Sequence, residues 1–287
     1  MRKVTQLPVS RRSVAVAVAL VSTVSLAIGA NAALSVRSLD AARPPATEQA
    51  AVLVPRQQSD RLALVIGNGH YPDASEPLSQ PLNDARALTG ALRHDGFDVD
   101  VVEDANKDDM TRAIERLKSK IRPDSVVMLF FGGYGVQVGR ESYMIPVDAT
   151  IWKERDVRRQ GVSVESVLDM MKEQGARAKL VVLDASRRNP YERRFRSFSH
   201  GLAPITAPNN TLVLSATTPD RVADDSKGVN SVLVAELLNH LDAKGAGAEA
   251  VFDKTRLAVS SASDGAQVPS VSSSLLEDVR FGKNAGS

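Results

Sequence analysis

The chain has no cysteine among its 287 residues. This absence excludes disulfide bonds, thiolate metal sites and a cysteine nucleophile. A strong charge of one sign is also missing, because 36 basic residues face 34 acidic ones, for a net charge of +2. Nucleic acid is therefore not expected as the main partner, since a surface that follows phosphates needs a marked basic excess. No phosphate-binding loop, dinucleotide glycine pattern or zinc-ligand spacing occurs, and we predict neither a cofactor nor a metal.

Long apolar runs are lacking except for one near the N-terminus. Basic residues (Arg2, Lys3, Arg11 and Arg12) precede an uncharged apolar run over residues 13–30, and small residues follow at Ala30-Asn31-Ala32. This layout is typical of an export signal cleaved after Ala32. The run is also close to the minimum length for spanning a bilayer, so a retained membrane anchor is the alternative, with a buried helix of the fold as a third. The first two predict an exported protein, periplasmic or anchored to the membrane and facing the periplasm.

Three regions follow from composition along the chain. Residues 1–32 form the signal or anchor. Residues 33–60 are rich in Ala, Pro, Gln, Ser and Arg without usable periodicity, which indicates a linker. Residues 61–283 have the regular pattern of one folded domain.

Short apolar runs alternate with segments of helical spacing in this domain. The expected strands cover residues 62–66, 97–102, 126–131, 180–183 and 211–216, with a polar tail strand near 276–281 and a short hairpin around Tyr143. The expected helices cover residues 84–94, 108–121, 164–173, 231–241 and 248–259. Such alternation predicts an α/β fold, a mostly parallel sheet with helices on both faces.

Function in such sheets gathers in the loops that follow the carboxyl ends of the strands. Three segments lie there, namely 68–71, 132–135 and 184–188. The second places Tyr134 between two glycines, and the third carries Ser186. Side chains at the ends of two neighbouring strands can meet, and this spacing would suit a base that takes a proton from a nucleophile.

Two of these segments carry a family resemblance. Residues 130–137 (FFGGYGVQ) resemble the F-x-S-G-H-G-x-Q segment of the caspase and metacaspase superfamily, which carries the catalytic histidine. Residues 183–190 (LDASRRNP) resemble the L-D-A-C-R-N-N-P segment of its bacterial members, which carries the catalytic cysteine. Supporting matches run from Ala63 to Phe281, almost the whole chain after the linker. The resemblance implies a caspase-like three-layer sandwich and a peptidase ancestry.

The chain departs from the family pattern at the catalytic positions. Tyr134 occupies the histidine position, Ser186 the cysteine position, and Gly132 replaces a family serine. Tyrosine titrates near 10, so only about one molecule in a thousand is ionised at neutral pH. Losing a nucleophile or base costs about 10⁴ to 10⁶ in turnover. These substitutions predict a pseudopeptidase that binds peptides or a protein partner.

Other readings stay open. One is an active peptidase in which Ser186 attacks and Tyr134 is the base, activated by Arg187 or Arg188. Another recruits a different histidine, for which His70 and His200 are placed better than His94 and His240, although none matches a catalytic position. Further alternatives are an envelope scaffold and a hetero-oligomer with an active relative. Calcium dependence occurs in some metacaspases, but no ligand set is readable here.

The resemblance also implies a recognition site. In metacaspase-like relatives, acidic residues at the positions of Asp84 and Asp184 bind the basic side chain that precedes the cut. Two carboxylates would suit an Arg or Lys guest through charge-assisted hydrogen bonds. The alternative is that Asp84 caps its own helix and Asp184 bonds nearby backbone. The arginine-rich stretch 187–196 is expected to be a solvated loop, and Trp152 to be partly buried.

Overall fold

The computed structural model describes residues 60–72, 77–188, 190–191, 202–205, 207–219, 221–223, 228–241 and 245–282. The predicted signal or anchor, nearly all of the predicted linker and most of the arginine-rich stretch therefore lie outside the described residues. Among the helices that are described, none combines the length and apolarity needed to cross a membrane.

A six-stranded sheet organises the domain, in the order β2-β1-β3-β7-β8-β9. Its strands are β1 (Arg61–Gly67), β2 (Asp98–Glu103), β3 (Val126–Gly132), β7 (Ala178–Asp184), β8 (Thr211–Ser215) and β9 (Ser270–Ser273). All neighbouring pairs are parallel except β8 and β9, which are antiparallel. The predicted α/β class with a mostly parallel sheet is confirmed.

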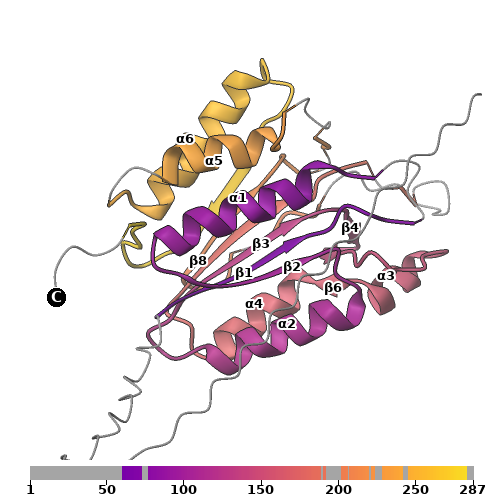
Figure 1. The fold of residues 1–287 in the computed structure, drawn as a ribbon, viewed down its shortest axis with the longest axis horizontal. Helices are drawn as coiled ribbons and strands as arrows, with labels where there is room; N and C mark the ends of the chain where they lie inside the picture. Colours follow the sequence, from indigo (N-terminus) through magenta and orange to yellow (C-terminus); the bar gives the residue numbers. More distant parts are fainter. Residues whose placement is uncertain are drawn as a thin grey trace, which may run out of the picture. The chain divides into compact units, whose positions relative to one another are not determined.

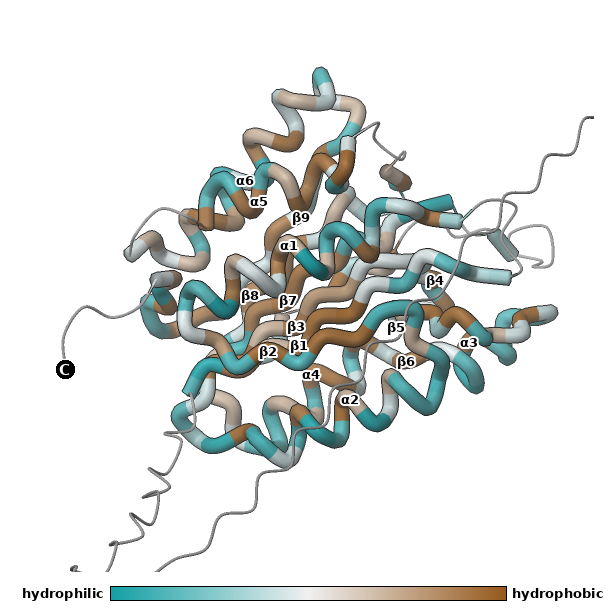
Figure 2. The backbone as a smooth tube through the Cα atoms, in the orientation of Figure 1, coloured by the Kyte–Doolittle hydropathy of each residue, from teal (hydrophilic) through white to brown (hydrophobic). Residues whose placement is uncertain are grey.

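Helices cover both faces of this sheet (Figure 1). One face packs against α1 (Gln80–His94), α5 (Val232–Leu241) and α6 (Ala248–Ala262), and the other against α2 (Lys107–Lys120) and α4 (Val164–Glu173). Side chains of a strand alternate between faces, so Met128 and Phe130 of β3 join the first core while Val127 and Leu129 join the second. Strands buried on both faces explain the continuous apolar runs in the sequence, seen as hydrophobic colouring of the central strands in Figure 2.

A small second sheet follows β3. It contains β4 (Gly135–Val138), β5 (Glu141–Met144) and β6 (Val162–Ser163), in that order, which confirms the predicted hairpin around Tyr143. A short helix, α3 (Glu154–Gln160), precedes β6 and was missed from sequence. Its one apolar residue, Val157, is fully buried, but a single apolar position gives no periodicity to detect.

The predicted tail strand near 276–281 is wrong. The last strand of the sheet is β9, which starts six residues earlier at Ser270 and pairs with β8. In the predicted stretch, the structure has only an isolated bridge between Arg280 and Gly247. β9 is three serines and one valine, so it carries little strand signal of its own, and its pairing with β8 determines its conformation.

A lysine is buried in β7, far from the carboxyl ends of the strands. Lys179 is 2% exposed, and burial, with some repulsion from Lys172, lowers its pKa. The unfolded state therefore binds more protons between the two pKa values, and stability should rise as the pH rises through that window. We expect Lys179→Met to raise the free energy of unfolding at pH 7 by about 1–2 kcal/mol, because a buried charge is replaced by an apolar chain of similar length.

Thermal and urea unfolding would measure this effect, with Lys254→Met on the exposed surface of α6 as the control. The control should change stability by less than about 0.5 kcal/mol. A loss of stability in Lys179→Met would mean that the ammonium group makes a favourable interaction that outweighs its desolvation.

Candidate functional site

The candidate site lies where β1, β3 and β7 end. Gly67, Gly132 and Asp184 are in register across these strands, so the loops that follow them start at one level. The order in which successive strands are added to the sheet also changes direction here, because β2 lies on one side of β1 and β3 on the other. Ligand crevices of open α/β sheets occur at such a switch point. The structure thus brings together the loop segments that the sequence singled out.

Backbone hydrogen bonds join the two loops that carry Tyr134 and Ser186. The amide of Gly133 donates to the carbonyl of Asp184 at 3.2 Å, and that of Gly135 donates to the carbonyl of Ala185 at 3.0 Å. The predicted pairing of these loops is therefore present. Tyr134 is 9% exposed and Ser186 is 1% exposed. Neither side chain is presented openly to solvent.

Tyr71 holds Tyr134 in place, a role that was not predicted from sequence although segment 68–71 was singled out. Their rings meet edge to face with centroids 4.7 Å apart. The Tyr71 hydroxyl donates to the carbonyl of Ile145 at 2.9 Å and accepts from the amide of Tyr134 at 3.1 Å. Burial raises the pKa of Tyr71, so this hydroxyl stays protonated and able to donate. The local sequence gives no signal for this role, because the contacts of the Tyr71 hydroxyl are with residues 63 and 74 positions further along the chain.

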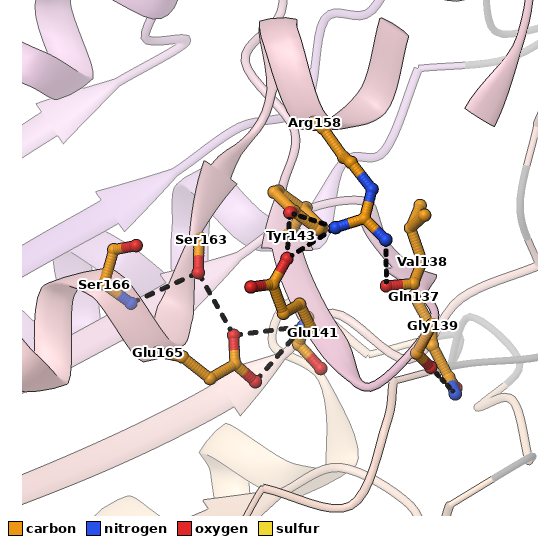
Figure 3. A network of polar contacts seen from close by, with 10 residues as sticks. Gln137, Val138, Gly139, Glu141, Tyr143, Arg158, Ser163, Glu165 and Ser166 are labelled. Carbon is orange, nitrogen blue, oxygen red and sulfur yellow. Dashed lines mark hydrogen bonds and ion pairs between the residues drawn. The ribbon is translucent and has the colours of Figure 1, made fainter. Parts of the chain in front are cut away.

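The hairpin that follows Tyr134 is fixed by a second polar network (Figure 3). The Tyr143 hydroxyl donates to Glu141, and Arg158 of α3 forms an ion pair with the same carboxylate at 2.9 Å. On the other side, Glu165 accepts from the amide of Ser142, and burial raises the pKa of Glu165. These contacts tie α3 and α4 to β5 and so support the loop of Tyr134.

Arg187, next to Ser186, is buried at 6% exposure. Its Nη1 donates to the carbonyl of Asp184 at 2.6 Å and to that of Gly133 at 3.4 Å. The same nitrogen lies 3.5 Å from Oδ1 of the Asp184 carboxylate. These contacts direct the charge of Arg187 toward Asp184 and two backbone carbonyls, whereas Arg188 is exposed. The prediction that this whole stretch is a solvated loop is wrong for Arg187.

Asp84 and Asp184, predicted to form one acidic site, do interact. Asp84 is 0% exposed and Asp184 is 2% exposed, and in each the Oδ2 oxygen is buried and has no hydrogen-bond partner among the described residues. Burial, and secondly the charge of Asp184, raises the pKa of Asp84 to about 7. Carboxyl groups placed together out of water resist double ionisation.

The alternative that Asp84 caps its own helix is wrong. α1 begins at Gln80 after Ser79, so Asp84 lies in the second turn. Its Oδ1 instead accepts from the amide of Ser231 at 3.0 Å and from Nδ2 of Asn230 at 2.8 Å. Asp84 therefore satisfies donors just before α5, 146 residues away in the chain.

The histidine alternative finds little support. His70 follows β1, but its Nδ1 lies 2.6 Å from Oδ2 of Asp104, which follows β2, on the opposite side of β1 from β3. The His70 side chain is 68% exposed there. His94 and His240 lie near the ends of α1 and α5, and His200 is outside the described residues.

Trp152 differs from its predicted partial burial. It is 62% exposed, just before α3, while its neighbour Ile151 is fully buried. In the part of the chain that the structure describes, no cluster of three or more His, Asp or Glu side chains is suited to hold a metal ion.

Comparison with known proteins agrees with this architecture. The caspase domain family matches residues 60–280. The human mucosa-associated lymphoid tissue lymphoma translocation protein 1 is 30% identical over 135 residues, which is 46% of this chain and 16% of that protein. Its mouse homologue matches to the same extent, so the chain spans about a sixth of these curated relatives. With the fold, the placement of the two loops and a family match over most of its length, the chain belongs to the caspase domain family.

Proposed function

We propose that this caspase-domain protein binds peptide segments containing Arg or Lys, free or within a partner protein, and does not cut them. The observation that carries the proposal is the buried acid pair Asp84 and Asp184. Close to it in the chain and the sheet are Tyr134 and Ser186, at the positions that resemble the family's catalytic histidine and cysteine. The acids supply recognition of a cation. Tyr134 and Ser186 make a poor base and nucleophile, because neither ionises readily near neutral pH.

The contacts of Arg187 favour this proposal over a serine peptidase. A Tyr134 base would need a cation at its phenol to favour ionisation. The Nη1 of Arg187 lies 3.5 Å from Oδ1 of Asp184 and donates to the carbonyl of Gly133, so the buried carboxylate offsets the charge that such a base would need. The proposed location is the cell envelope, on account of the apolar run at residues 13–30, and an active relative in a hetero-oligomer is one form the partner could take.

Cleavage of a panel of fluorogenic peptides containing Arg or Lys tests the proposal. We expect no turnover by the purified protein, and turnover by the double variant Tyr134→His/Ser186→Cys, which restores a thiol and an imidazole. A third sample, Ser186→Ala, is the control for residual chemistry. The expected gap between the natural protein and an active dyad is about 10⁴-fold or more.

Each outcome has a distinct meaning. Turnover by the natural protein that disappears in Ser186→Ala would establish a serine peptidase and overturn the proposal. Silence from all three proteins, together with partner binding that ignores Asp84→Asn, would instead favour a scaffold that does not use the acid pair.

A further inference from the structure

The acid pair has more acceptor capacity than its surroundings satisfy. Asp84 comes from α1 and Asp184 from the end of β7, and both Oδ2 atoms are buried with no hydrogen-bond partner in the part of the chain that the structure describes. A buried carboxylate oxygen without a donor is costly, and an ionised one more so. The pair can therefore accept further hydrogen bonds from a ligand that carries donor groups.

The charges around the pair do not cancel. Among the described residues that the structure places against the two carboxyls, the one cation is Arg187, 3.5 Å from Asp184. The segment before α5 contributes the neutral donors Asn230 and Ser231. With both acids ionised, these described groups sum to one negative charge at the buried pair.

A proton or a cation can supply the missing charge. Burial raises the pKa of Asp84 to about 7, so the proton is taken up near neutral pH in the absence of any guest. An Arg or Lys side chain brings a permanent positive charge and N–H donors, and so satisfies the same oxygens. A proton and a basic side chain do not bind the pair together, because either one alone supplies the positive charge that the pair lacks.

We propose that a proton and a basic guest compete for the Asp84–Asp184 pair, so that the pair takes up an Arg or Lys side chain by releasing a proton and rejects it in mild acid. This inference rests on the proposed function, since it describes how the same acidic site is regulated. Because the proton and the guest exclude each other, the affinity for the basic guest should increase as the pH rises. Below about pH 7, affinity rises with pH by up to about tenfold per unit, and above that value it levels off.

Entry of a guest also involves the segment that covers Asp84. Nε2 of Gln80 donates to the carbonyl of Gly228 at 3.1 Å, and Nδ2 of Asn83 donates to that of Val229 at 3.1 Å. These amides, with Asn230, hold the segment against α1. A guest that enters from the side of this segment would displace it, at the cost of a few hydrogen bonds that are each worth about 1 kcal/mol.

Titration calorimetry of the full chain with N-acetyl-arginine amide tests the competition, with the neutral isostere N-acetyl-citrulline amide as the matched control. Repeating the titration at pH 6 in buffers of different protonation enthalpy counts the protons released. We expect release of close to one proton per guest at pH 6, release of almost none at pH 9, and no binding of the citrulline compound. Asp84→Asn should bind the arginine compound more weakly and without proton release.

The outcomes separate this inference from the proposed function. Binding of the arginine compound with no proton release would overturn the competition and leave the acidic site intact. No binding at any pH would overturn both. A measurement without a guest tests the proton alone: the raised pKa means that stability falls as pH rises from about 4 to about 7, and Asp84→Asn should abolish that fall. Parallel pH profiles for the two proteins would contradict proton uptake by Asp84.

Discussion

Replacing Arg187 with methionine is expected to lower the free energy of unfolding by about 3–5 kcal/mol, the cost of leaving a buried ion without its partner. The side chains of Arg187 and Asp184 are 7% and 3% exposed, so water cannot replace the lost contact. The substitution also leaves the carbonyls of Asp184 and Gly133 without this donor. Methionine keeps the volume but supplies neither charge nor N–H groups.

Arg188→Met is the matched control, because Arg188 is the next residue and is exposed. Urea unfolding of the two variants should differ by several kcal/mol, with the control within about 0.5 kcal/mol of the natural protein. The double variant Arg187→Met/Asp184→Asn should recover part of the loss, since it removes the uncompensated charge. Equal stability of the two single variants would show that Arg187 is not an internal counter-ion.

The second large effect is expected at Gly133. A Cβ added to this residue would lie 2.6 Å from the Tyr71 hydroxyl and 3.0 Å from the Phe131 ring, and the backbone has φ +155°, which side chains rarely adopt. Tyr71 cannot retreat without losing its hydrogen bonds to Ile145 and Tyr134. We expect Gly133→Ala to cost about 2–3 kcal/mol, the usual range for overpacking.

Gly90→Ala makes the same chemical change with the opposite expected sign. Gly90 lies in the exposed face of α1, and an added Cβ there meets nothing within 4 Å. Alanine should stabilise the helix by about 0.5–1 kcal/mol. Thermal unfolding of both variants tests the pair, and a neutral effect of Gly133→Ala would mean that the Tyr71 contact yields easily.

The sequence by itself determined the layered architecture. Apolar runs such as residues 126–131 predicted strands buried on both faces, and helical spacing over residues 164–173 predicted α4 with both its bounds. The local pattern of apolar residues indicates which side chains are buried, and a sheet covered by helices on both faces buries whole strands. The motifs around Tyr134 and Ser186 likewise predicted that their two loops lie together, as the backbone hydrogen bonds between the loops confirm.

Only the tertiary structure decided what the site residues contact. Arg187 turned inward to Asp184, and Asp84 met donors 147 residues further along at Ser231, although both residue types are ordinarily found in water. The last strand was likewise predicted in the wrong place, and Trp152 was expected to be partly buried, because each outcome depends on contacts with distant segments. These outcomes depend on which distant segments the fold brings within hydrogen-bond distance. The local sequence around a residue does not show which remote segment it will meet.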